Sequence, residues 1–145
     1  MGTKLISDAS YACIGTLPIA LPETELRRGD ILQIASFTLT QGQKAVLKML
    51  NLSIIRYLND GVVFDYINSS YGIATVGLFS TSMVGAPLVR ASGNGVGIFT
   101  TNPYEDVVIS LPGTYTVKVL NNTGRTYLTA LDVAVSVTGA IKFYA

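Results

Sequence analysis

The spacing of turn-forming residues constrains the fold of this chain more than any other feature of its sequence. Clusters of Pro, Gly, Asn and Asp recur about every eight to fifteen residues along the 145-residue chain. Most of the connections between them are too short for the crossover helix that parallel strands need. Residues 114–120 alternate polar and apolar side chains, so that Tyr115, Val117 and Val119 share one face of a strand. The pattern predicts an all-β chain, a single antiparallel β-sandwich or jelly roll of about 8–10 strands that spans residues 1–145.

Other segments show the same strand signature with local variations. Residues 30–40 alternate with one change of phase, which a β-bulge would absorb. Residues 44–58 contain good helix formers, but the alternation of Leu52, Ile54, Arg56 and Leu58 favours a long strand, with a helix as the alternative. Asn, Asp and Gly at 59–61 and at 121–124 predict hairpin turns, the second of which would join residues 114–120 to residues 126–138. We expect further strands at 62–67, 72–81, 88–92, 96–101, 106–111 and 140–144.

The composition removes several classes of chemistry. The chain has no histidine and one cysteine, so it lacks the commonest general base and metal ligand and cannot form an internal disulfide. Ten Lys and Arg against nine Asp and Glu give a net charge of +1 without any basic block, which argues against nucleic acid as a partner. Cys13 stands between Ala12 and Ile14, and we interpret it as an inert, buried residue of an apolar strand.

The few clusters that resemble catalytic or ligand sites have simpler interpretations. The acidic pairs stand in apparent loops near prolines, and the oxygen-bearing residues around the 59–61 turn lack the looped calcium pattern. A glycine-rich loop lacks the sixth-position glycine of a dinucleotide site and is better explained as a turn. We therefore expect no enzyme, no cofactor and no metal site. The clusters are Glu23/Glu25, Glu105/Asp106, Asn59 with Asp60 and Asp65, and Gly93 to Gly97.

No segment predicts secretion or membrane insertion. The first residues lack a basic segment followed by an apolar run, so we expect synthesis in a cytoplasm. The uncharged stretch from Tyr66 to Val89 is interrupted by glycines and by Pro87, which is not the pattern of a transmembrane helix.

The scarcity of charge is the main indication of function. Charged residues make up 13% of the chain, and Arg90 is the only one between Tyr66 and Tyr104. A surface with so few charges exposes large uncharged areas, which mark partner interfaces. We expect an obligate homo-oligomer, and we place Phe79, Met83, Pro87 and Leu88 in its interface.

Residues 17–26 form a second candidate contact. Pro18 and Pro22 cannot donate to a sheet ladder, whereas Leu17, Ile19 and Leu21 are too apolar to remain in water. We interpret the segment as an extended arm or loop that docks on a neighbouring subunit or on a larger shell.

The run from Leu111 to Val117, followed by a predicted hairpin and a terminal strand that ends in an aromatic residue, resembles the late strands of trimeric jelly rolls of the TNF/C1q type. It is similar also to β-sandwich modules on the heads and fibres of tailed phages. The resemblance covers about a quarter of the chain, and it implies a homotrimer with a scaffold or attachment role and no catalysis.

These observations predict a structural protein, a capsid decoration or cement subunit of a virion that is made in the host cytoplasm. Its expected partners are further copies of itself, favouring a trimer, and a major capsid protein or other shell subunit. The alternative is a jelly-roll binding module that recognises a glycan or a protein ligand, and a non-viral version would be cytoplasmic.

Overall fold

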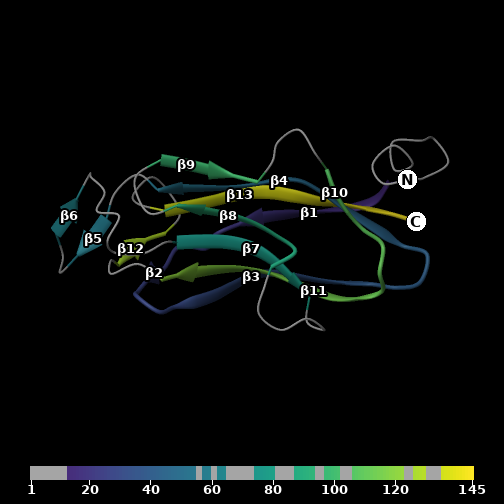
Figure 1. Cartoon of the computed structure of the whole chain (residues 1–145), viewed down its shortest axis with the longest axis horizontal. Helices are drawn as coiled ribbons and strands as arrows, with labels where there is room; N and C mark the ends of the chain where they lie inside the picture. The colour runs from purple at the N-terminus through teal and green to yellow at the C-terminus, as the bar shows by residue number, and fades with distance from the viewer. Residues whose placement is uncertain are drawn as a thin grey trace.

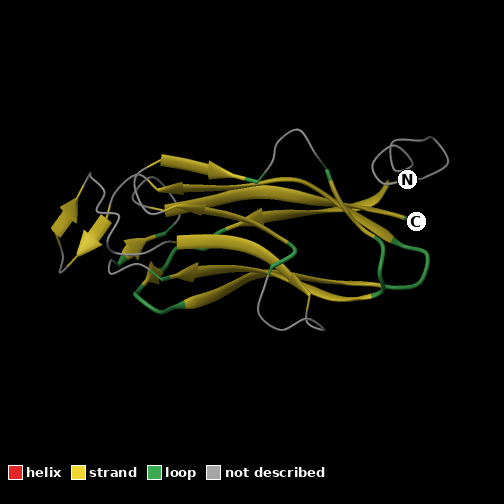
Figure 2. Ribbon diagram, viewed as in Figure 1, coloured by secondary structure: helices red, strands yellow, loops and turns green. Residues whose placement is uncertain are grey.

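A computed structural model describes residues 13–54, 57–59, 62–64, 74–80, 87–93, 97–101, 106–122, 126–129 and 135–145. The described residues form strands joined by turns and loops, without a helix (Figures 1 and 2). This part of the chain accordingly offers no helix that could span a membrane. The strands are β1 (Cys13–Ala20), β2 (Glu25–Leu26), β3 (Ile31–Leu39), β4 (Lys44–Ile54), β5 (Tyr57–Asn59), β6 (Val62–Phe64), β7 (Ala74–Ser80), β8 (Val89–Gly93), β9 (Gly97–Thr100), β10 (Val107–Ile109), β11 (Gly113–Asn121), β12 (Tyr127–Leu128) and β13 (Val135–Tyr144).

Two antiparallel sheets make up the body of the fold. The first has the order β1-β13-β4-β10, with β9 pairing the other end of β4, and the second has the order β3-β11-β7-β8. Along the chain, each connection between these strands changes sheet, except those from β7 to β8 and from β9 to β10. This is the strand order of a jelly roll built from two Greek keys. The prediction of an all-β antiparallel sandwich is confirmed.

The strand assignments follow the local sequence pattern closely. Residues 44–54 form a strand rather than a helix, and β5 pairs antiparallel with β6, with Asn59 opposite Val62. Strand β3 carries the predicted bulge, because Val117 lies opposite Ala35 while Lys118 lies opposite Gln33, which leaves Ile34 as the additional residue. The turn before β4 uses Gly42, whose φ of 87° favours glycine.

One predicted hairpin is wrong. Residues 114–120 and the final long strand do not pair, because β11 lies between β3 and β7 in the second sheet and β13 lies between β1 and β4 in the first. Both strands present alternate apolar residues to the same core from opposite sides. Alternation identifies the buried face of a strand and does not identify its neighbour.

The hydrophobic core lies between the two sheets. Strand β4 contributes Leu47, Leu50 and Leu52, and the facing strands β7 and β11 contribute mainly valines. The fully buried members include Leu47, Leu50, Leu52, Val76, Leu78, Val117, Val119 and Ile141.

The segment predicted to be an arm belongs to this sandwich. Its first part is strand β1, which pairs with β13 so that Pro18 lies opposite Ala140. Ile19 and Leu21 are only 2% and 5% exposed and belong to the core cluster, and Leu17 packs against it. The interpretation of Leu17, Ile19 and Leu21 as a docking arm is therefore wrong. An edge strand accommodates proline because the side without a neighbour needs no donor.

Candidate interaction surface

The edges of the two sheets are almost free of charge. Among the described residues, β1, β9 and β10 bound the first sheet, whereas β3 and β8 bound the second. These strands together contain one charged residue, Arg90 in β8. Edge strands in soluble proteins usually carry charges that prevent pairing with another chain. The edges of the sandwich therefore lack the charges that commonly prevent association.

The exposed large hydrophobic side chains lie along the same edges. Ile14 is in β1, Ile31 begins β3 and Ile98 is in β9, whereas Leu88 directly precedes β8 and Leu111 follows β10. Single exposed apolar residues are ordinary on a protein surface, but their common position at sheet edges is informative. Their exposed fractions are 54% for Ile14, 64% for Ile31, 41% for Leu88, 72% for Ile98 and 71% for Leu111.

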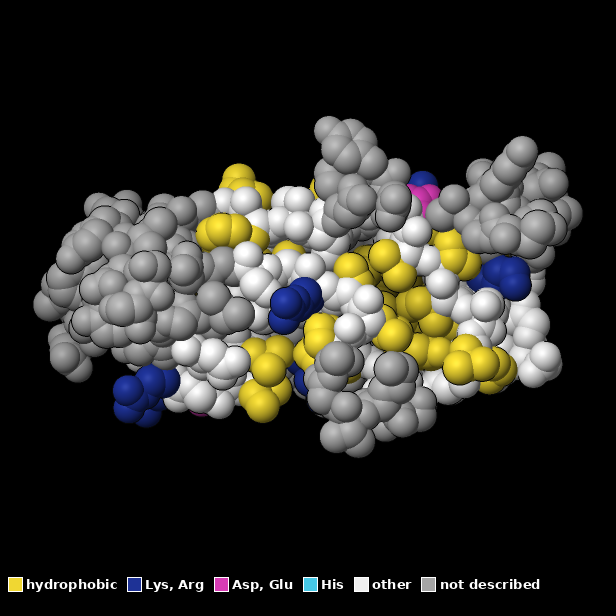
Figure 3. All heavy atoms as spheres, viewed as in Figure 1, with side chains coloured by type: hydrophobic (Ala, Val, Ile, Leu, Met, Phe, Trp, Pro, Cys, Tyr) yellow, Lys and Arg dark blue, Asp and Glu magenta, His cyan; other side chains and the backbone are white. Residues whose placement is uncertain are grey.

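An apolar groove opens between the two sheets at one edge of the sandwich. It has a volume of about 400 Å³ and runs between β10 and the ends of β7 and β8. The space-filling view shows apolar side chains gathered over this region (Figure 3). The hydroxyl of Tyr115 borders the groove and donates a hydrogen bond of 2.5 Å to the carbonyl of Leu111. The described lining residues carry no charge: Ser80, Leu88, Val107, Val108, Ile109, Ser110, Leu111 and Tyr115.

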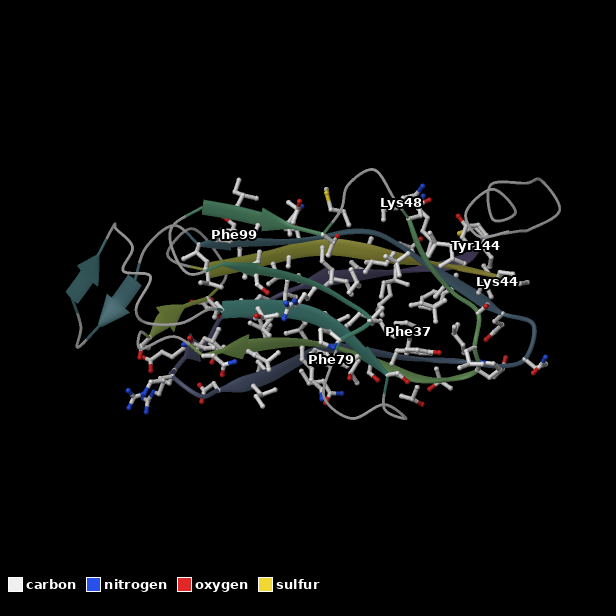
Figure 4. The ribbon with its side chains drawn as sticks, viewed as in Figure 1. Phe37, Lys44, Lys48, Phe79, Phe99 and Tyr144 are labelled. Carbon is white, nitrogen blue, oxygen red and sulfur yellow. The ribbon has the colours of Figure 1, made fainter. Side chains whose placement is uncertain are left out.

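A smaller hollow of about 210 Å³ lies at the opposite edge, between β1 and β3. Ile14, Phe37 and Phe143 are among its lining residues. The Phe37 ring, labelled in Figure 4, lies on β3. It stacks on Tyr115, with centroids 5.3 Å apart, and meets Phe143 edge-on at 5.2 Å. Phe37 lines the hollow and Tyr115 lines the larger groove, so their stacked rings lie between the two.

Two of the predicted interface residues come together on the outer face of the second sheet. A Cβ added at Gly77 would lie 3.1 Å from the Phe79 ring and 3.2 Å from Pro87, so these two side chains flank the glycine. The Lys118 ammonium lies 5.2 Å from the centroid of the Phe79 ring, which is a cation–π distance. Leu88 lies at the larger groove.

The remaining predicted interface residues do not join this surface. Leu17, Ile19 and Leu21 pack on the interior, and Met83 lies outside the described residues. Ile31, Ile98 and Leu111 are exposed residues at or beside the edges that were not predicted from the sequence. The absence of charge and proline from residues 31–39 was the signal that could have identified the β3 edge.

The described members of the two acidic pairs form ion pairs or are exposed. Glu25 forms an ion pair of 3.1 Å with Arg27, Asp106 forms one of 2.9 Å with Lys48, and Glu23 is exposed. No group of three potential ligands forms a metal site within the described residues. Asp60, Asp65 and Glu105 lie outside them, as do residues 94–96 of the glycine-rich loop.

The prediction that Cys13 is buried is wrong. Cys13 is exposed at the start of β1 and forms no disulfide. The register with β13 shifts between Cys13 and Gly15, which makes Ile14 a bulge residue and leaves the beginning of the strand outside the core. An apolar local sequence does not ensure burial at the end of an edge strand.

Comparisons with known proteins assign no family. No family model and no curated protein matches the chain. Among solved structures, it is similar to a protein of Bacillus endospore appendages, which are described as a family of disulfide-linked pili. The two chains are 10% identical over 92% of this chain and 88% of the other, with a TM-score of 0.43. This likeness is too distant to support a function.

Proposed function

We propose that this chain is a structural subunit that assembles with further copies of itself. The observation that carries the proposal is the set of sheet edges, which together hold one charged residue and gather the exposed large hydrophobic side chains. Burial of these edges against other copies would remove apolar surface from water and pair unsatisfied backbone groups. Closed symmetric oligomers are the usual way to achieve this.

The specific form that we propose is a decoration or cement subunit on a viral capsid, assembled as a trimer and without enzymatic activity. Its support is the resemblance of Leu111 to Val117 to trimeric jelly rolls and phage modules, together with the low charge of the chain. Phe79, Pro87 and Leu88 would contribute to a contact with another copy or with the shell. Such a subunit would be made in the host cytoplasm and would function on the virion.

A binding module is the second candidate, and the apolar groove favours it. A groove of about 400 Å³ lined by aliphatic side chains and hydroxyls suits an apolar segment of a protein ligand. A glycan is a weaker candidate for this groove, because no carboxylate stands among its described lining residues.

Light scattering of the purified protein at low micromolar concentration tests the structural function. We expect an oligomer whose mass is a whole-number multiple of 15.4 kDa, with three copies for a single trimer and six where two trimers associate. A folded, soluble monomer at that concentration would contradict the proposal and favour the binding module. An oligomer of another size would support the structural role and contradict the proposed trimer.

A further inference from the structure

Strand β3 is the longest edge of the sandwich that has no local protection against pairing. It is 9 residues long, contains neither a charged residue nor a proline, and pairs within the described residues with β11 alone. Ser36 and Thr38 are exposed on its outer side. Their hydroxyls engage β11 without introducing charge, through Tyr115 and Thr114 respectively.

The other edges are less suited to pairing with a further strand. Strand β1 is 8 residues long but has Pro18 near its middle, which removes one backbone donor. Strand β8 has 5 residues and carries Arg90, whereas β9 has 4 residues and β10 has 3. Among the described edge strands, β3 alone combines this length with the absence of charge and proline. The edge that matches it best is therefore β3 of a second copy.

We propose that β3 of one copy pairs antiparallel with β3 of a second copy about a two-fold axis. This pairing would join two four-stranded sheets into one continuous sheet of eight strands. The inference rests on the proposed assembly of this chain with itself and specifies one contact of that assembly. A two-fold contact would join two trimers, since two-fold and three-fold axes combine in a closed D3 assembly of six copies.

The absence of charge in β3 has a direct role in this geometry. Across a two-fold axis every side chain meets its own kind or a near neighbour on the same strand. A charged residue near the axis would face a like charge, which destabilises cross-strand pairs. Uncharged Ser, Thr and Gln side chains avoid this repulsion, and Ser and Thr can form hydrogen bonds across the pair.

The bulge in β3 determines the register. Ile34 interrupts the regular ladder, whereas Ala35 to Leu39 pair without a shift with Val117 to Gly113. The largest overlap of two such regular segments places the two-fold axis at Phe37. Ser36 of each copy then lies directly opposite Thr38 of the other copy.

A charge-reversal pair tests both the contact and its register. The variant Ser36→Lys/Thr38→Lys places like charges opposite each other twice, so we expect its self-association to weaken about tenfold or more. The variant Ser36→Lys/Thr38→Glu places opposite charges at the same two points, and we expect its association to return to within about threefold of the unmodified protein. Dissociation constants come from analytical ultracentrifugation, with circular dichroism to verify folding.

A matched control uses exposed positions outside the edge strands. The variant Thr24→Lys/Asn122→Lys adds the same two charges beside β2 and after β11, and it should associate like the unmodified protein. A monomeric unmodified protein would overturn the assembly and the β3 contact together. Assembly that survives the double lysine change in β3 would overturn the β3 contact alone, as would equal loss of assembly in the Lys/Lys and Lys/Glu variants.

Discussion

At the scale of single residues, the tightest backbone approach among the described glycines occurs at Gly139. A Cβ at this position would lie 2.7 Å from the carbonyl oxygen of Met49 and 3.0 Å from the Leu50 side chain. The register between β13 and β4 shifts just beyond it, between Gly139 and Ile141. Glycine is required here because the irregular ladder brings the backbone of β4 where a side chain would be.

The variant Gly139→Ala should lose about 1–3 kcal/mol of unfolding free energy, because the backbone of β4 must move to admit the methyl group. Urea denaturation of the purified protein measures the change. Gly15→Ala is the matched control: no atom lies within 4 Å of its added Cβ, and its φ is not in the left-handed region. The interpretation of Gly139 fails if the two variants have the same stability.

At the scale of elements, strand β1 combines an inner face that packs on the core with a free edge that carries no charge. Its inner residues cover the end of the interior next to β13, and its outer residues are exposed, including Pro18. The strand thus contributes packing on one face and limits further pairing along its free side.

Replacing Leu17, Ile19 and Leu21 together by Ser should unfold the subunit rather than release an arm. Placing a hydroxyl at a buried aliphatic position costs about 2–5 kcal/mol, so the two core residues alone approach the total stability of a domain of this size. Thermal melting followed by circular dichroism measures the loss. The control Thr16→Ser/Ala20→Ser changes exposed residues of the same strand and should melt like the unmodified protein. A triple variant that melts normally but fails to assemble would support the interpretation of this segment as a docking arm.

At the scale of the whole molecule, the described residues are held together by apolar packing and backbone ladders. The described ion pairs are surface contacts: Lys48 with Asp106, and Arg27 with Glu25. Contacts of this kind contribute little to stability. Hydrophobic burial between the sheets supplies the main favourable free energy.

Removal of divalent metal ions should leave the melting temperature unchanged. We expect the same melting curve with and without EDTA, because the chain lacks histidine and its acidic residues in the described part form no ligand cluster. Differential scanning calorimetry provides the measurement, with added magnesium as a control for the chelator itself. A loss of several degrees that calcium restores would indicate a calcium site around Asn59, Asp60 and Asp65.

The sequence by itself determined the secondary structure and the class of fold. Alternation and turn residues predicted β3 with its bulge, β4 as a strand, and the pairing of β5 with β6. These features depend on neighbours within a few residues, where side-chain direction and backbone preference act directly. Low charge likewise predicted an interaction surface. Phe79 and Pro87, two of the residues selected for it, both lie beside Gly77, and their burial in an interface stays a prediction.

Only the tertiary structure decided which strands lie at an edge and which residues are buried. The sequence pattern of residues 17–21 suits an arm or an edge strand equally. The pairing of β1 with β13, more than a hundred residues away in the sequence, shows that the segment begins as an edge strand. The same long-range pairing separates β11 from β13 and leaves Cys13 exposed. Burial depends on what the rest of the chain places against a side chain, and a local pattern does not contain that information.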